Sequence, residues 1–192
     1  MTSRSSPPDP EFYVLIFDCG TDGREISDIN SNYDSLVESG HELIIGLRDV
    51  YPEFTYQQRG KLLQKMTKAV KKAAIKPQII LATMEIEAWF LAEHTHFMKL
   101  DSILTSERAS EIAQCNLLYD NLELLEHPSK VLKNIYESVG LEWEKSQADM
   151  IRTLGALDFS AMSTLVPERV KSLKPFVSAL ESLMTYRQAC EP

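Results

Sequence analysis

Short runs of apolar residues alternate with amphipathic stretches over the first half of the chain. The apolar runs are FYVLIF (12–17), HELIIGL (41–47) and PQIILAT (77–83). Each run is short, rich in β-forming residues and bounded by polar or turn-forming residues, as is typical of a buried strand. The amphipathic stretches, with apolar residues at helical spacing, are 24–40, 56–75 and 88–97. The pattern therefore predicts three strands, each followed by a helix.

Strands that alternate with helices in this way are typical of βαβ units and a mostly parallel sheet. From residue 100 onward the pattern is helical only, in segments 101–116, 127–140, 144–157 and 166–189. We therefore predict an α/β fold, with a mostly parallel sheet flanked by helices and a helical C-terminal half packed on it. The Ser- and Pro-rich residues 1–11 are expected to be a disordered tail. Residues 12–192 are expected to form one domain, with an α/β core (12–99) and a helical part (100–192).

Charge and composition narrow the function classes. The 192 residues carry a net charge of −8, so the overall field of the chain does not attract nucleic acid. A nucleic-acid contact would need a local basic patch, a bound cation or a basic partner. The three widely separated cysteines, the absence of an apolar leader and the absence of a run of about 20 apolar residues predict a cytoplasmic protein without a membrane segment.

Acidic residues follow the carboxyl end of every predicted strand. They are Asp18 and Asp22, Asp49 and Glu53, and Glu85 and Glu87. Binding sites in parallel sheets collect at this edge, and Mg²⁺ prefers oxygen ligands, usually one or two carboxylates with water and phosphate. The alternative explanation is that loops are polar and that helix N-termini favour negative charge.

Glu85 and Glu87 stand where the third predicted strand meets a helix. In extended backbone, residues two apart point to the same side, so both carboxylates would face one site. If a helix begins at Glu85, the two side chains diverge by about 200°. The sequence leaves both arrangements open.

Lysines form the basic features of the chain. The one clear patch lies in residues 61–76, where Lys68, Lys71 and Lys72 are candidates for contact with a phosphate backbone. The alternative is a solvated helix face. Lys130 follows a proline at a predicted helix start, where a cation could neutralise phosphate charge.

Four segments together resemble an uncharacterised bacterial family in the TOPRIM-like group, whose domains occur in topoisomerases, primases and OLD-type nucleases. The segments are YVLIFDCGTDG, IIGLRDVYPE, ATMEIEAWFLAE and EHPSKVLKNIY. The resemblance implies a compact TOPRIM-like fold whose acids bind Mg²⁺ or Mn²⁺. Proteins of the broader group often accompany ABC-type ATPases in anti-phage defence. The resemblance therefore also implies an ATPase partner and cleavage of DNA or RNA, by analogy.

The first two acidic motifs of the family each depart from the usual pattern at one position in this sequence. Asp18 stands where a glutamate is typical after the first strand, and Asp22 matches the second acid of that block. Asp49 matches the first acid of a DxD pair, but Tyr51 occupies the second position. Glu53 lies two residues further on as a substitute.

The later family positions match more closely, because Glu85 and Glu87 correspond to an acidic block and Lys130 to the family's lysine. We therefore predict a metal-dependent nuclease or nuclease subunit, with Glu85, Glu87 and Lys130 catalytic. Its expected metal ligands are Asp18, Asp22, Asp49, Glu85 and Glu87. Two alternatives remain: a non-catalytic protein–protein interaction module with a degenerate TOPRIM-like fold, and a small-molecule phosphohydrolase.

Overall fold

A computed structural model describes residues 13–20 and 23–190, with side chains through residue 183. The chain is α/β and about 53% helical, so helices dominate a small parallel sheet. The elements of the sheet region are α1 (Glu25–Glu38), β1 (Ile45–Asp49), the 3₁₀ helix η1 (Tyr56–Gln58), α2 (Arg59–Ala69) and β2 (Gln78–Ala82). None of the described helices is long and apolar enough to cross a bilayer.

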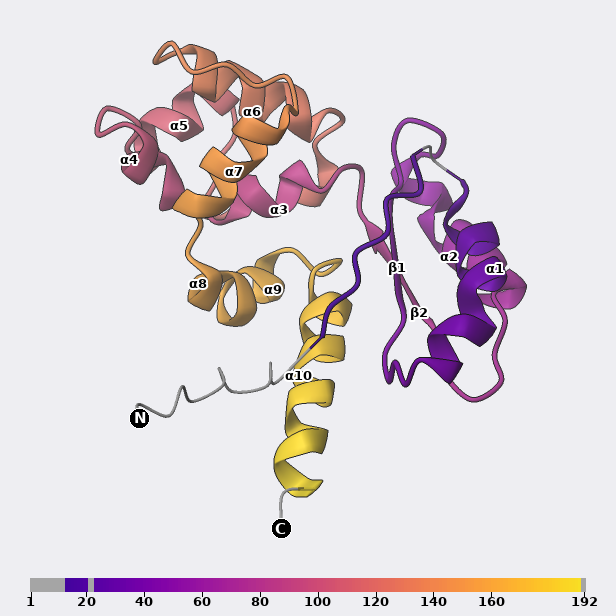
Figure 1. The fold of residues 1–192 in the computed structure, drawn as a ribbon. Coiled ribbons are helices and arrows are strands. Elements are labelled where there is room, and N and C mark those ends of the chain that lie inside the picture. Colours follow the sequence, from indigo (N-terminus) through magenta and orange to yellow (C-terminus); the bar gives the residue numbers. More distant parts are fainter. Residues whose placement is uncertain (1–12, 21–22, 191–192) are drawn as a thin grey trace, which may run out of the picture.

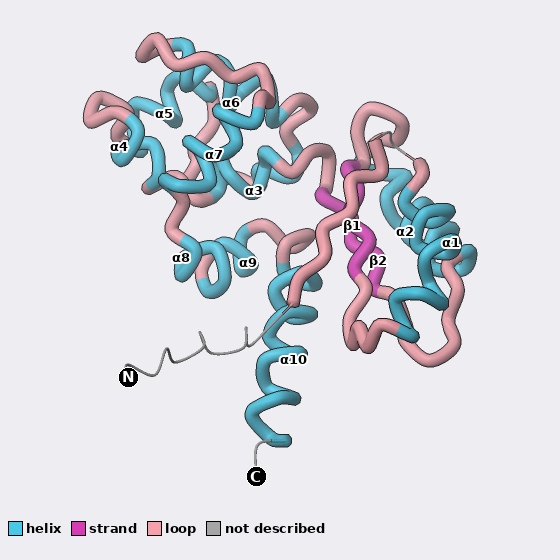
Figure 2. Tube along the Cα trace, in the orientation of Figure 1, coloured by secondary structure: helices cyan, strands magenta, loops and turns pink. Residues whose placement is uncertain are grey.

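The rest of the described chain is a set of helices joined by short loops (Figures 1 and 2). They are α3 (Glu87–Ala92), α4 (His96–Leu100), α5 (Ser106–Ala113), η2 (Leu122–Leu124), α6 (Pro128–Glu137), α7 (Gln147–Ala156), α8 (Phe159–Thr164), α9 (Val166–Arg169) and α10 (Lys174–Cys190). Helices were expected in all four segments of this half, and each contains at least one. The helical part begins earlier than residue 100, because α3 packs against α6, η2 and α9.

The two strands pair in parallel, with Ile45 beside Gln78 and Asp49 beside Ala82. Helices α1 and α2 lie on one side of the sheet and the helical part lies on the other (Figure 1). The alternation of the strands explains this layering, since successive side chains point to opposite faces. Ile80 and Ala82 join the large core of the helical part, while Leu81 packs with Leu62 and Met66 of α2.

The expected first strand is not a strand. Residues 13–17 have no regular secondary structure and pair with no other described segment, and the described strands form a single two-stranded sheet. These five side chains are between 53% and 87% exposed; Phe12 and the expected tail, 1–11, lie outside the described residues. An apolar run indicates a preference for burial without specifying the surface that would bury it, and here no described element covers this run.

The helix expected over 56–75 ends at Ala69, because side chains of α1 bind the backbone that follows. Asn30 Oδ1 accepts a hydrogen bond from Lys71 N (2.6 Å). The Tyr33 hydroxyl accepts from Ala73 N (2.9 Å) and Ile75 N (2.7 Å). These bonds replace the helical ones and lead the chain into β2. Lys71 and Lys72 of the basic patch therefore lie beyond the end of α2 rather than on one of its faces.

Candidate functional site

Asp49 is the last residue of β1 and faces the helical part of the molecule. Ile45 and Leu47, on the same face of the strand, pack against the core of that part. Arg48 points the other way, into an ion-pair cluster with Glu25 (3.4 Å) and Glu53. The alternation of β1 therefore directs Asp49 toward the segment after β2, where Asp49 Oδ1 accepts a hydrogen bond from Ile86 N (3.0 Å).

Glu85 links this segment to the first turn of α6. Its side chain is buried, and both carboxylate oxygens bind Ser129: Oε2 accepts from the backbone N and Oε1 from the hydroxyl, each at 2.8 Å. Pro128 begins this helix, where a missing N–H costs nothing, and the first turn favours negative charge. Glu85 therefore acts as a cap supplied by a distant segment.

Glu87, the first residue of α3, is 2% exposed and only half satisfied. Its Oε1 binds Lys145 Nζ at 2.7 Å. Its Oε2 is buried and finds no hydrogen-bond partner among the described residues. A buried carboxylate oxygen without a donor is costly, so this atom is the one in the cluster that most needs a cation or a donor.

The charges in this cluster perturb one another. Burial, followed by the charge of Glu87, raises the pKa of Asp49 to about 7, although Lys145 acts in the opposite direction. Burial tends to lower the pKa of Lys145, but its hydrogen bond to Glu87 and the nearby carboxylates outweigh burial and raise it. The one ammonium group compensates the carboxylates only in part.

Two non-glycine residues in or directly beside this group of charges have left-handed backbone. Met84 has φ of 62° and Lys145 has φ of 58°. Each such conformation costs on the order of 1 kcal/mol, and such residues gather at functional sites. Met84 turns the chain from β2 toward Glu85, and its carbonyl accepts a hydrogen bond from Tyr51 N (2.8 Å). Lys145 lies immediately before the cap of α7, which is Ser146.

The structure shows neither of the two arrangements left open for Glu85 and Glu87, because β2 ends at Ala82 and no helix begins at Glu85. The helix begins at Glu87, and the two glutamates bind different partners, yet both act on Asp49. The cluster is therefore Asp49, Glu85 and Glu87 with Ser129 and Lys145. The five residues come from β1, the segment between β2 and α3, the first position of α3, the start of α6 and the loop before α7.

The other predicted metal ligands do not join this cluster. Asp18 Oδ1 accepts from Gly20 N (2.8 Å), and its charge acts on Cys19 beside the start of α1. Asp22 lies outside the described residues. Glu53 pairs with Arg48 on the opposite face of β1, so it does not substitute for the acid that Tyr51 replaces. No three His, Cys, Asp or Glu side chains within the described ranges converge closely enough to hold a metal ion together.

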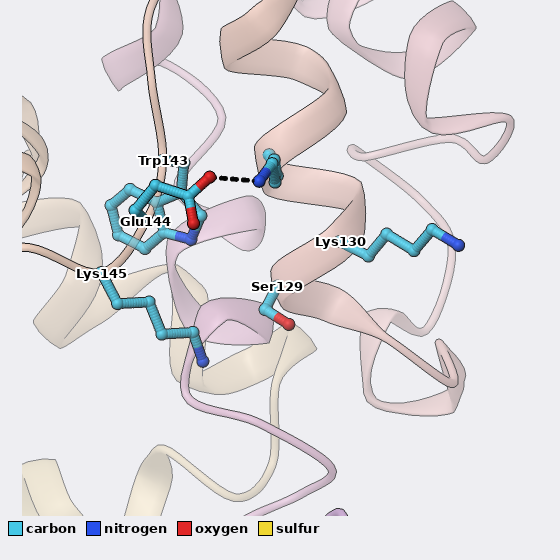
Figure 3. A pocket seen from close by; sticks show the side chains of 6 residues that line it. Ser129, Lys130, Trp143, Glu144 and Lys145 are labelled. Atoms are coloured by element: carbon cyan, nitrogen blue, oxygen red, sulfur yellow. Dashed lines mark hydrogen bonds and ion pairs between the residues drawn. The ribbon is translucent and has the colours of Figure 1, made fainter.

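The predicted nucleic-acid lysines lie at the other end of the sheet. Because α2 runs from the end of β1 back to the beginning of β2, its last turn, with Lys68, is remote from Asp49. Lys71 also pairs with Asp34 (2.6 Å). Lys130 is exposed on α6 and extends away from Ser129 and Lys145 (Figure 3).

Sequence reasoning missed Ser129 and Lys145. Ser129 lies inside the segment EHPSKVLKNIY, beside the lysine that the resemblance singled out. Lys145 is part of EWEKS, where it resembles any charged loop residue. The only nearby signal is the capping box of Ser146 and Asp149, which fixes the start of α7. Nothing in the sequence indicates that Lys145 points at Glu87.

Comparison with family models, curated proteins and solved structures gives no match for this chain. Its function is therefore inferred from the geometry of these side chains.

Proposed function

We propose that the chain is a divalent-metal-dependent phosphodiesterase acting on nucleic acid, a TOPRIM-like nuclease or nuclease subunit, with Mg²⁺ or Mn²⁺ held by Asp49 and Glu87. The observation that carries the proposal is the buried Glu87 Oε2, which lacks a partner among the described residues. Its neighbour Asp49 also carries only one hydrogen bond among them, on Oδ1. Two carboxylates are the usual protein contribution to a magnesium site.

Only some of the carboxylate oxygens in the cluster are available to bind such an ion. Both carboxylate oxygens of Glu85 accept hydrogen bonds from Ser129, so Glu85 would hold the segment before α3 in position rather than bind the ion. Lys145 holds Glu87 Oε1 and leaves Oε2 available. A bound divalent ion would polarise the phosphodiester and activate water.

Hydrolysis joins the water oxygen to phosphorus and breaks one ester P–O bond, and the leaving alkoxide takes up a proton. Lys145 is the cation placed to offset charge that develops on the phosphate, because its side chain is half exposed and still contacts Glu87. It takes the role expected of Lys130. The acidic net charge is compatible with nucleic acid if a basic ABC-type ATPase partner supplies the remaining affinity.

Mn²⁺ binding followed by calorimetry tests the proposal. The wild type should bind, while Asp49→Asn and Glu87→Gln should lose at least about tenfold in affinity. Asp18→Asn is the matched control, because the resemblance would make Asp18 a ligand and the structure places it elsewhere. Cleavage of single-stranded DNA and RNA should follow the same order. If the wild type failed to bind Mn²⁺, both alone and with a phosphorothioate oligonucleotide, the proposal would be wrong.

A second candidate is the non-catalytic interaction module. Two observations favour it: Lys145 already neutralises part of the cluster, and residues 13–17 expose a contiguous apolar surface. Exposed apolar patches often mark protein contacts. Retention of a partner complex by a Glu87→Gln variant, with no metal binding by the wild type, would favour this candidate. Hydrolysis of mononucleotides without hydrolysis of polynucleotides would instead favour a small-molecule phosphohydrolase.

A further inference from the structure

A pocket of about 320 Å³ is lined by residues at the start of α6 and in the loop before α7 (Figure 3). Its lining residues are Ser129, Lys130, Lys133, Trp143, Glu144 and Lys145. Two of them, Ser129 and Lys145, also bind Glu85 and Glu87. The pocket and the carboxylates therefore share walls, and a molecule could touch both.

Basic side chains outnumber acidic ones among the residues that line the pocket. Three lysines line it against one glutamate, Glu144, which pairs with Lys133. Lys133 also pairs with Glu137 at 3.7 Å and is only partly exposed. Lys130 lies at the rim and extends outward (Figure 3). Lys133 and Lys145 are thus the two lining cations that carboxylate partners hold in place.

Trp143 supplies an independent sign of a ligand. Its side chain is 3% exposed and its ring lies edge-on to Tyr136, with the centroids 5.5 Å apart. The indole Nε1–H is buried and has no acceptor among the described residues. An indole nitrogen can only donate, and a buried donor is normally paired. Trp143 lines the pocket, so we take the missing acceptor to be a group bound there, and the lysines favour an acceptor that is an anion.

We propose that this pocket binds a phosphate monoester of a nucleotide substrate, with Trp143 Nε1 and the ammonium groups of Lys133 and Lys145 as donors. Such a group carries nearly two negative charges and three acceptor oxygens, which matches two cations and one neutral donor. The assignment of that phosphate to the strand cleaved beside Asp49 and Glu87 rests on the proposed function. The phosphate would be the terminal one of a polynucleotide.

Binding in the presence of EDTA tests the pocket apart from the metal site. The probes are two single-stranded oligonucleotides of one sequence, one with a 5′-phosphate and one with a 5′-hydroxyl group. The wild type should bind the phosphorylated form about tenfold more tightly or better. Tryptophan emission gives the readout, because the only other tryptophan, Trp89, donates its Nε1–H to Ser172 (2.9 Å) in the core.

Lys133→Met is the informative variant, because Lys133 pairs with Glu137 and Glu144 rather than with Glu85 or Glu87, so its loss leaves the cluster intact. It should remove the preference for the 5′-phosphate while Mn²⁺ binding persists. Trp143→Phe should remove the emission change and weaken binding of the phosphorylated oligonucleotide measured by calorimetry. Lys72→Met removes an exposed lysine at the other end of the sheet; it is the control and should keep the wild-type preference for the 5′-phosphate.

Equal affinity of the wild type for the two oligonucleotides would overturn the proposal, as would an unchanged preference in Lys133→Met. Binding of a deoxynucleoside 5′-monophosphate as tight as that of the phosphorylated oligonucleotide would support the pocket and identify a free nucleotide as its source. If the 5′-phosphate preference is absent but the wild type binds Mn²⁺, the pocket proposal is wrong and the metal-site proposal is retained. If the wild type does not bind Mn²⁺ but prefers the 5′-phosphate, the metal-site proposal is wrong and the pocket proposal is retained.

Discussion

Replacing Asp49 with Asn should stabilise the metal-free protein, and more so as the pH rises. The folded chain holds the Asp49 proton up to a pKa of about 7, whereas the ordinary value is 3.8. The unfolded chain therefore releases this proton first, so stability is lost as the pH rises from about 4 to 7. The full difference corresponds to about 4 kcal/mol, and the part between pH 5 and pH 8 to about 3 kcal/mol. Asparagine does not ionise, and its Oδ1 can still accept from Ile86 N.

Urea denaturation in EDTA at pH 5, 6, 7 and 8 measures this effect. The free energy of unfolding of Asp49→Asn minus that of the wild type should grow across the series and level off above pH 7. Taking the difference cancels other titrating groups that both proteins share. Asp34→Asn is the control, because it removes the charge of an exposed acid that pairs with Lys71 away from the cluster. A constant difference for Asp49→Asn would refute the reasoning, since it would mean that burial and Glu87 do not hold the proton on Asp49.

Three further predictions concern stability and use the same denaturation assay. Glu85→Ala should cost about 2–4 kcal/mol, because two charged hydrogen bonds to Ser129 are lost and the first turn of α6 loses its cap; a cost below about 0.5 kcal/mol would contradict the capping role. Burial lowers the pKa of His96 to about 4 despite the opposing effect of Glu93, so the advantage of the wild type over His96→Asn should shrink by roughly 3 kcal/mol as the pH falls from 6.5 to 4. An advantage independent of pH would mean that His96 titrates normally. Ile16→Asn should change stability by less than about 0.5 kcal/mol, because Ile16 is 87% exposed; a loss above about 2 kcal/mol would show that residues 13–17 are a buried strand after all.

Local patterns in the sequence predicted much of the fold. The parallel pairing of β1 with β2 follows from two apolar runs separated by a helical stretch, and the segments that contain α5, α6, α7 and α10 follow from their periodicity. These features depend on neighbours along the chain. Residues 13–17 are exposed because no described element covers them. Helix α2 ends early because the side chains of Asn30 and Tyr33, far away in the sequence, bind the backbone that follows it. A single sequence does not specify those partners.

The candidate site shows the same division. Asp49, Glu85 and Glu87 could be found because parallel strands bring their carboxyl ends to one edge. The alternation of Arg48 and Asp49 also explains why Glu53, which looked like a substitute ligand, belongs to the other face. Ser129 and Lys145 could not be found, since their positions depend on how α6 and α7 pack against the sheet, and this is decided by the core of the helical part.

The bonds from Glu85 to Ser129 and from Glu87 to Lys145 have a consequence for how the chain folds. Both join the segment after β2 to residues much further along, so closing them costs loop entropy that local helices do not. The cluster should therefore form late, after α6 and the loop before α7 have docked. A fragment that stops before Ser129 would keep both glutamates and lose both partners. Expression of the sheet region alone should for this reason give an unstable, protease-sensitive polypeptide rather than an autonomous unit.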